Sequence, residues 1–207
     1  MYRKAANVLL PILALAASFG PGLAIAETLN NSGSSGHCPT IAPGPVAIYD
    51  LDNILPSVVS QDVVAVDAIR NTLAQYPFAI DGKNYDRLDK VFTQNAVVNY
   101  SAPIGVLSGL PAIKTIADGL AMFNRTHHSY GTQYIKICSP SSAIAITYYT
   151  ASHFLTPDLG PTFAPDTQAL YAYGQYQDTL AKQNDGTWKV TYRNLVYQGP
   201  LIIDQNS

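Results

Sequence analysis

Apolar residues recur at helical spacing in the first part of the patterned region. Between residues 60 and 76 they fall three or four positions apart, which predicts one amphipathic helix that Pro77 ends or bends. The stripe consists of Val64, Ala68, Ile69, Thr72, Leu73 and Tyr76. After a turn at 81–84, the pattern predicts a short helix over 85–92 and a third over 108–123, capped near Ser108 or Gly109.

Further along, the pattern changes to strands rich in Tyr, Thr, Ile and Val. A short strand at 96–100 is followed by predicted long strands at 126–137, 143–155, 168–182 and 187–203. Asn184, Asp185 and Gly186 form a hairpin signal between the last two strands, and a proline-rich loop occupies 156–167.

This order of helices, one strand, another helix and four long antiparallel strands predicts an α+β fold. We expect a strongly curved, mainly antiparallel sheet that packs against about three N-terminal helices. Residues 60–207 would then form one cone-shaped barrel. The cavity inside such a cone is a natural small-molecule site.

The N-terminus follows another pattern. Arg3 and Lys4 precede an apolar run over 8–19 and small residues at 24–26, which is the layout of a signal peptide at 1–26. An extended segment, 27–59, follows it. We therefore expect a secreted or secretory-lumen chain without a membrane anchor after cleavage, and an uncleaved anchor is the alternative.

The cysteines and asparagines suit that compartment. Cys38 and Cys138 are the only cysteines, so they predict a single disulfide, with two buried free thiols as the alternative. N-x-S/T sequons predict glycosylation at Asn30, Asn99 and Asn124. Asn30 lies in the polar tail and is the most accessible of the three, whereas Asn99 lies in a predicted strand.

Composition narrows the class of function. The 207 residues include 12 basic and 14 acidic side chains, a net charge of −2, which provides no basic stripe for nucleic acid. The chain has 14 tyrosines against 6 phenylalanines. Tyrosine suits pocket walls that are apolar with a polar tip, although most single tyrosines simply pack a core.

Candidate chemistry centres on His127, His128 and His153, which fall on predicted strands, and on Asp81 just past the first helix. A histidine oriented by a carboxylate is a general acid/base pair. The alternative is that these residues have a purely structural role, held by hydrogen bonds. A histidine–carboxylate metal site is disfavoured, because adjacent His127 and His128 should point to opposite faces of their strand.

Several segments resemble scytalone dehydratases, SnoaL-like members of the nuclear-transport-factor-2-like superfamily. They are Asp81-Gly-Lys-Asn-Tyr-Asp-Arg-Leu-Asp-Lys-Val91, Val98-Asn99-Tyr100, Thr126-His127-His128, Tyr148-Tyr149-Thr150-Ala151-Ser152-His153 and Asp185-Gly186-Thr187-Trp188-Lys189. The resemblance spans residues 60–200 and implies the same α+β cone. The Asp-Gly-x-Trp hairpin is common to the superfamily, whereas the Asp, Tyr and His set is more specific.

The resemblance also implies roles for individual residues. His128 matches the general acid/base histidine, His153 the second histidine, and Asp81 the carboxylate that pairs with His153. We therefore expect His128 to be the catalytic acid/base, with Asp81 and His153 as its partners. Tyr100 matches the tyrosine that helps to polarise the substrate carbonyl. Elimination of water β to a ketone needs a base, an acid and a donor to the enolate, and requires no metal or organic cofactor.

Two departures from the family pattern bear on the substrate. Ile80 stands where the family has a second tyrosine, and the family's polar strand residues fall near Gln175 and Gln177. With Tyr76 and Tyr149, these residues complete the predicted substrate contacts. The departures indicate a small hydroxylated carbonyl compound other than scytalone, such as a polyketide or terpenoid intermediate.

Other functions fit the same pattern. A cyclase, isomerase or pericyclase of the Diels–Alder type would keep Asp81 and His128 in a catalytic role. A non-catalytic small-ligand binding module would use the tyrosines as pocket walls. We expect a homo-oligomer, dimer or trimer, in each case.

Overall fold

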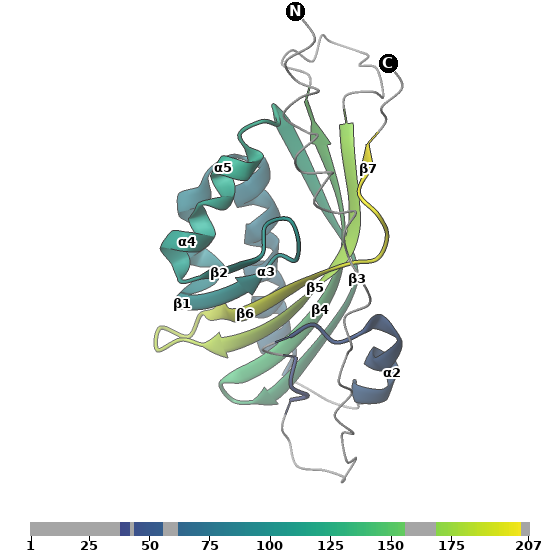
Figure 1. Cartoon of the computed structure of the whole chain (residues 1–207). Coiled ribbons are helices and arrows are strands. Elements are labelled where there is room, and N and C mark those ends of the chain that lie inside the picture. The colour runs from purple at the N-terminus through teal and green to yellow at the C-terminus, as the bar shows by residue number, and fades with distance from the viewer. Residues whose placement is uncertain (1–37, 42–43, 56–61, 156–168, 204–207) are drawn as a thin grey trace, which may run out of the picture.

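The computed structural model describes residues 38–41, 44–55, 62–155 and 169–203. Helices come first and long strands afterwards, as the hydrophobic pattern predicts (Figure 1). The predicted signal peptide, Asn30 and the loop at 156–167 lie outside the described residues.

The helical elements are short except for α3. They are η1 (Ile48–Asp50), α2 (Leu51–Ile54), α3 (Val63–Asp81), η2 (Tyr85–Lys90), α4 (Leu110–Lys114) and α5 (Ile116–Leu120). The strands are β1 (Phe92–Asn99), β2 (Val106–Ser108), β3 (Arg125–Ser139), β4 (Ser142–Phe154), β5 (Ala169–Lys182), β6 (Trp188–Tyr197) and β7 (Ile202–Ile203).

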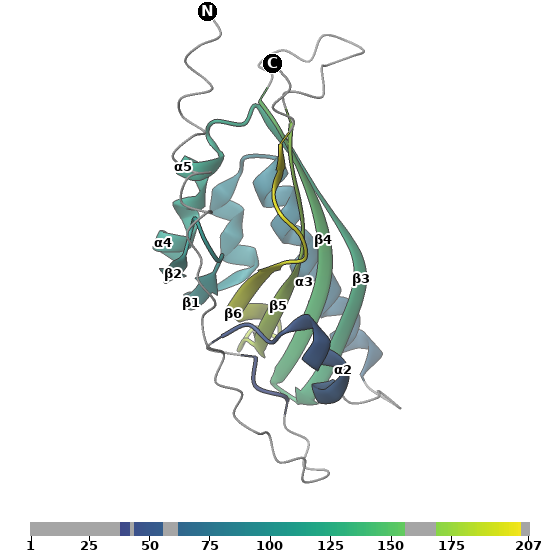
Figure 2. The same cartoon turned by 45° about the vertical axis from the view of Figure 1, so that its right-hand side comes forward.

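All seven strands belong to one sheet. Its order is β2-β1-β6-β5-β4-β3, with β7 paired to β5. Only the β1–β6 pair is parallel among the described strands. The sheet curves around the helices without closing, which confirms the predicted α+β cone (Figure 2).

Helix α3 lies inside the curve of the sheet. It begins at Asp62, whose carboxylate accepts hydrogen bonds from the backbone N–H groups of Val64 and Ala65. Val64 itself is exposed, so its predicted place in the buried stripe is wrong. The stripe that packs on the sheet runs through Ala65, Val66, Ile69, Leu73, Tyr76, Ala79 and Ile80.

The end of α3 also differs from the prediction. The helix continues through Pro77 to Asp81, although proline removes one helical hydrogen bond. Ala79 and Ile80 beyond the proline are fully buried, and their packing stabilises the extra turn. Asp81 therefore lies on the last turn of a rigid helix and not in a loop.

Three other elements depart from the sequence pattern. The predicted helix over 108–123 is two short helices that meet at Thr115. The predicted last strand is divided into β6 and β7, and the three residues of β2 are too few to produce a recognisable alternation.

A bulge in β3 changes which residues face α3. Tyr130 is paired with Tyr149, but Gln133 is paired with Thr147, so β3 contains one extra residue between these two pairs. Before the bulge the even-numbered residues face the concave side, and after it Ile135 and Ile137 do. The bulge allows one strand to serve both the cavity and the core.

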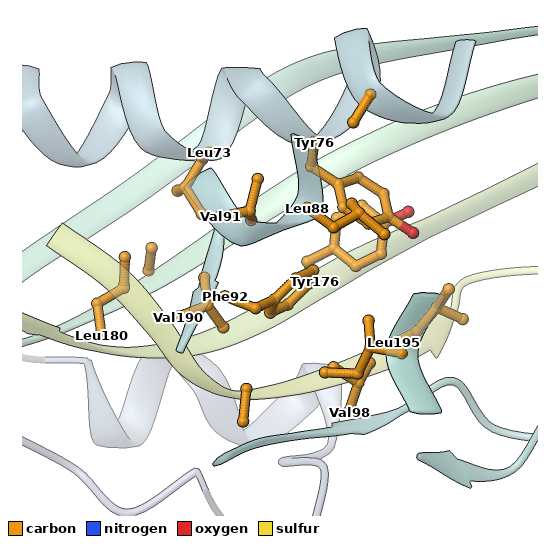
Figure 3. Close-up of a cluster of buried hydrophobic side chains, with 14 of the residues drawn as sticks. Leu73, Tyr76, Leu88, Val91, Phe92, Val98, Tyr176, Leu180, Val190 and Leu195 are labelled. Carbon is orange, nitrogen blue, oxygen red and sulfur yellow. The ribbon is translucent and has the colours of Figure 1, made fainter. Parts of the chain in front are cut away.

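The core lies between α3 and the concave face of the sheet. Figure 3 shows Leu73 and Tyr76 of α3 above Tyr176 and Leu180 of β5. The Tyr76 and Tyr176 rings meet edge to face, with 5.6 Å between their centroids. Tyr76 therefore joins the core to the cavity described below.

Residues 38–41 and 44–55 cover part of the outer face of the sheet (Figure 2). The predicted disulfide between Cys38 and Cys138 is present and fastens this segment to β3. Asn194 donates a hydrogen bond to the carbonyl oxygen of Ile41 at 2.7 Å, and Ile41 is fully buried. Among the described helices, none is long and apolar enough to cross a membrane.

Candidate active site

A cavity of about 480 Å³ opens between α3, α5 and the concave face of the sheet. Most of its wall is apolar, including Ile116, Leu120 and Phe123 on one side and Ala151, Leu170 and Leu195 on the sheet. The polar groups in the wall are Tyr76, Tyr100, Thr115, His128, Tyr149, His153, Tyr176 and Tyr197. A site of this size and composition suits a small, largely apolar molecule.

Asp81 and His128 form a hydrogen-bonded pair at the edge of the cavity. Nδ1 of His128 lies 2.7 Å from Oδ1 of Asp81, and the backbone N–H of His128 donates to Oδ2 at 2.8 Å. Asp81 comes from the last turn of α3 and His128 from β3, so two rigid elements hold the pair. Because Nδ1 faces the carboxylate, Nε2 is the nitrogen that can act on a molecule in the cavity.

The carboxylate of Asp81 is kept ionised. Partial burial by itself would raise the pKa of Asp81, but hydrogen bonds from His128 and Thr126 outweigh this effect and hold the pKa below its ordinary value. Thr126 donates its hydroxyl to Oδ1 at 2.8 Å. The ionised carboxylate can orient the imidazole and stabilise it when it takes up a proton.

His153 of β4 is a different kind of histidine. Burial lowers its pKa to about 4, and the nearby His128 acts in the same direction. Its ring meets His128 edge to face, with centroids 5.4 Å apart. Within the described structure its buried Nδ1 has no hydrogen-bond partner. His153 is therefore a neutral polar group in the cavity wall at physiological pH.

Two phenols from different elements meet in the cavity wall. The hydroxyls of Tyr76, on α3, and Tyr100, which directly follows β1, are 3.0 Å apart. Burial raises the pKa of both phenols, and that of Tyr100 lies well above the ordinary value. Both therefore keep their protons at neutral pH and can donate hydrogen bonds.

Tyr149 provides a third phenol in this wall. Its ring stacks on Tyr176 with centroids 4.5 Å apart and passes over Gly174. A Cβ at position 174 would lie 2.8 Å from the Tyr149 ring and 2.5 Å from the carbonyl oxygen of Val196. Only glycine leaves room for this arrangement. Among the described groups, no partner is found for the buried Tyr149 hydroxyl.

Five of the residues predicted from the sequence line the cavity together: Tyr76, Tyr100, His128, Tyr149 and His153. Asp81 stands behind His128. Its hydrogen bonds go to His128, the partner we expect, and to Thr126, and not to His153 as the resemblance implies. His127 is exposed while His128 lines the cavity, which confirms their opposite orientation.

Three predicted substrate contacts lie elsewhere. Ile80 is buried in the core and does not line the cavity. Gln175 and Gln177 alternate with the cavity residues of β5, so both are buried on the outer face. Gln177 binds the backbone N–H and carbonyl of Val46 at 2.8 and 2.7 Å. The expectation that these glutamines face the cavity is wrong, because the strand register was one residue out.

Two predicted glycosylation residues lie close to the site. The side chain of Asn99 accepts a hydrogen bond from the backbone of Ser101, and Asn124 follows the cavity residue Phe123. Both asparagines are partly buried. Glycosylation at Asn30, Asn99 and Asn124 stays a prediction.

Three polar residues near the cavity were not predicted from the sequence. Thr126 holds Asp81, and two residues apart on a strand it shares a face with His128. Arg193 and Asp178 form a fully buried ion pair beneath the tyrosines. These two are cross-strand partners, but a register shift between Thr179 and Leu180 separates them from the hairpin at 184–186. Counting back from the hairpin would therefore have paired Asp178 with Tyr192 instead.

These groups provide the parts of an acid–base site. The Asp81–His128 pair can remove and return a proton, and the phenols can donate hydrogen bonds to an oxygen that gains negative charge. Neutral His153 can hold a hydroxyl group. All of them border one mostly apolar cavity, where low polarity strengthens each electrostatic interaction.

Comparisons with known proteins agree with this geometry. A family described as the SnoaL-like domain matches residues 61–194. An uncharacterised protein of Mycobacterium tuberculosis is 27% identical over 127 residues, which cover 60% of this chain and 80% of that protein.

Solved structures show the same fold. A crystal structure from Novosphingobium aromaticivorans, which carries the provisional name scytalone dehydratase, is 25% identical with a TM-score of 0.55. The match covers 66% of this chain and 86% of that one. A hexachlorocyclohexane dehydrochlorinase from Novosphingobium barchaimii is 13% identical with a TM-score of 0.56, covering 68% and 91%. At that identity the second match shows the fold alone.

Proposed function

The chain belongs to the SnoaL-like domain family, and from this premise we propose that it is a cofactor-independent dehydratase acting on a small hydroxylated carbonyl compound. One observation carries the proposal. An ionised carboxylate holds a histidine at the edge of an apolar cavity, and two hydrogen-bonded phenols line the same cavity. This is the combination that elimination of water β to a carbonyl needs.

The first step is proton transfer. Nε2 of His128 takes a proton from the carbon next to the carbonyl, and Asp81 stabilises the imidazolium that forms. The electron pair of the broken C–H bond moves toward the carbonyl oxygen. Tyr100, supported by Tyr76, donates a hydrogen bond to that oxygen as it becomes an enolate.

The second step expels water. The enolate re-forms the carbonyl and a carbon–carbon double bond, while the bond to the β-hydroxyl group breaks. The leaving oxygen takes the proton that His128 carries and departs as water, which returns the imidazole to its neutral form. Neutral His153 holds this hydroxyl by a hydrogen bond before it leaves.

The wall of the cavity supports a neutral, mainly apolar substrate. Among the described residues, no aspartate, glutamate, lysine or arginine lines it, and the ion pair of Arg193 and Asp178 is not part of the wall. The provisional name of the Novosphingobium aromaticivorans neighbour agrees with this class of reaction. We keep polyketide and terpenoid intermediates as the proposed substrate class.

We further propose that the mature chain acts in a secretory compartment or outside the cell, and the Cys38–Cys138 disulfide supports this. A dimer or trimer also stays a proposal. Light scattering on the purified chain would measure the oligomeric state.

Comparative metabolite mass spectrometry tests the reaction. The gene is deleted and restored as wild type, as His128→Ala, or as His127→Ala, the matched control whose side chain is exposed on the neighbouring position. We expect deletion and His128→Ala to accumulate a compound heavier than the lost product by one water, and His127→Ala to behave as wild type. Accumulation of an isomer of the product would instead identify a cyclase or isomerase, and no change would identify a binding module.

A further inference from the structure

A buried ion pair lies beneath the tyrosines of the cavity. Nε of Arg193 contacts Oδ1 of Asp178 at 2.7 Å, and Nη2 contacts Oδ2 at 2.9 Å. Both side chains are completely buried, and neither lines the cavity. Because desolvation offsets most of the attraction in such a pair, it adds little net stability compared with apolar side chains. Stability alone does not account for its position.

The guanidinium of Arg193 packs against aromatic rings. Its central carbon lies 4.5 Å from the centroid of the Tyr76 ring and 4.2 Å from that of Tyr176. A cation on the face of a phenol ring is attracted to it, and this attraction grows as the ring gains negative charge. Arg193 therefore makes the Tyr76 hydroxyl a stronger hydrogen-bond donor.

The Tyr76 hydroxyl connects the charge of Arg193 to Tyr100 through a hydrogen bond. It lies 3.0 Å from the hydroxyl of Tyr100, and Arg193 makes its ring contacts with Tyr76, Tyr176 and Phe92. Burial raises the pKa of both phenols, and the charge of Arg193 opposes this rise in both. Either hydroxyl could be the donor in this hydrogen bond. Because Arg193 lies over the Tyr76 ring, it favours the arrangement in which Tyr76 donates to Tyr100 and the Tyr100 proton can reach an acceptor in the cavity.

We propose that Arg193 is a positioning residue that polarises the Tyr76–Tyr100 pair, so that Tyr100 donates its hydrogen bond to an oxygen acceptor in the cavity. Asp178 holds the guanidinium in place over the rings through its two hydrogen bonds. The role rests on the proposed function, in which that acceptor is the carbonyl oxygen of the substrate. Arg193 acts through Tyr76 and does not touch the reacting atoms.

Other groups also face the phenol pair. They are Asp178 and Tyr176 from β5, Tyr130 and His128 from β3, and Arg193 from β6. Asp178 opposes Arg193 in its effect on the pKa of Tyr76, but more weakly. The test therefore replaces both members of the ion pair together, which also avoids leaving one buried charge without its partner.

The test measures the NMR chemical shift of Tyr100 Cζ in the ligand-free full chain. Tyrosine labelled with ¹³C at Cζ is incorporated, and the Tyr100 signal is identified from its loss in Tyr100→Phe. Four proteins are compared at neutral pH: wild type, Arg193→Met with Asp178→Leu, Tyr76→Phe, and the three changes combined. Near-ultraviolet circular dichroism verifies that each is folded.

We expect the ion-pair replacement to move the Tyr100 Cζ signal when Tyr76 is present and to move it much less when Tyr76 is Phe, where only the direct charge of Arg193 acts on Tyr100. The proposal would be overturned if the ion-pair replacement left the Tyr100 signal unchanged in the protein that keeps Tyr76. It would also be overturned if the signal moved equally with Tyr76 and with Phe at position 76. If the double replacement does not fold, Arg193→Lys keeps a charge beside Asp178 without the planar guanidinium. The same signal is then expected to move by less, and no movement would overturn the proposal.

Kinetics separate this proposal from the proposed function. On a β-hydroxyketone substrate we expect the folded double replacement to lower kcat by roughly 10-fold with KM unchanged, less than the ~10²–10³-fold lost with a direct oxyanion donor. A wild-type chain that eliminates water from no such ketone contradicts the proposed function. The Tyr100 signal would still decide whether Arg193 polarises the pair.

Discussion

Buried polar side chains lie on both faces of the sheet, but they meet different partners on each. On the concave face, His128, His153 and Tyr149 border a cavity of about 480 Å³. On the outer face, Gln177 and Asn194 are completely buried and bind the backbone of residues 41 and 46. The first group is available to a ligand, and the second holds the chain's own N-terminal segment.

Among the described residues, both faces have buried polar atoms without a hydrogen-bond partner, but only on the concave face do such atoms border the cavity. In the described structure the buried hydroxyl of Tyr149 and Nδ1 of His153 have no partner and border the cavity. The amide of Gln175 has no partner either, but it lies on the covered outer face. An unpaired buried group thus indicates a site only where it borders a cavity, because elsewhere it is a cost to stability.

The largest expected difference between the faces is in catalysis. Asp81→Asn removes the charge that orients and stabilises protonated His128, so the rate should fall by about 10²–10⁴-fold. The matched change on the outer face is Gln177→Ala, which should leave the rate within a few-fold of wild type. Steady-state kinetics with the substrate found by metabolite analysis measures both. Equal losses for the two variants would contradict the division between the faces.

The disulfide belongs to the outer face and should act on stability alone. Replacing Cys38 and Cys138 by Ser releases a loop closed over a sequence separation of 100 residues. In the chain-entropy account this lowers the free energy of unfolding by about 4–5 kcal/mol. Chemical denaturation measures the change.

Wild-type protein unfolded under reducing conditions is the control for the serine variant. Both should lose similar stability while the native catalytic rate is kept. A serine variant with normal stability but a lost rate would place the N-terminal segment in the function of the concave face.

His153 should make stability depend on pH. Its pKa is about 4 in the folded chain, against an ordinary value of 6.5, so only the unfolded chain binds a proton between these values. The free energy of unfolding should therefore fall as pH decreases from 6.5 to 4, by up to about 3 kcal/mol. Above pH 6.5 this contribution is constant.

Denaturation curves at several pH values in wild type and His153→Gln measure this contribution. The glutamine keeps a polar side chain but does not titrate, so the fall between pH 6.5 and 4 should become smaller. The effect of Asp81, whose pKa is lowered, falls mainly below this window. An unchanged pH dependence in His153→Gln would show that His153 is not buried as a neutral ring.

The smallest expected effect is a difference in stability between variants of two glutamines on the outer face, Gln175 and Gln177. Gln177→Leu removes both hydrogen bonds to Val46 and should lower the free energy of unfolding by about 1–3 kcal/mol. Gln175→Leu replaces an equally buried amide that has no partner in the described structure, so it should be neutral or stabilising. Thermal unfolding compares the two, and a larger loss for Gln175→Leu would mean that its amide has an essential partner.

Much of the fold follows from the sequence pattern. The periodicity of residues 60–76, the alternation after residue 125 and the hairpin at 184–186 were enough to predict the α+β cone. These signals are local, because helical and strand spacing depend on residues close in the chain. The chemical types at Asp81, Tyr100, His128 and His153, with the resemblance they carry, also indicated which residues line or support the site.

The geometry of those residues was decided by tertiary structure. Asp81 reaches His128 because α3 continues through Pro77. The bulge in β3 lets the first half of that strand line the cavity and the second half pack in the core. The register of β5 turned Gln175 and Gln177 outward and placed Asp178 under the tyrosines beside Arg193. A shift of one residue exchanges the two faces of a strand, and sequence alone does not set the register to that accuracy.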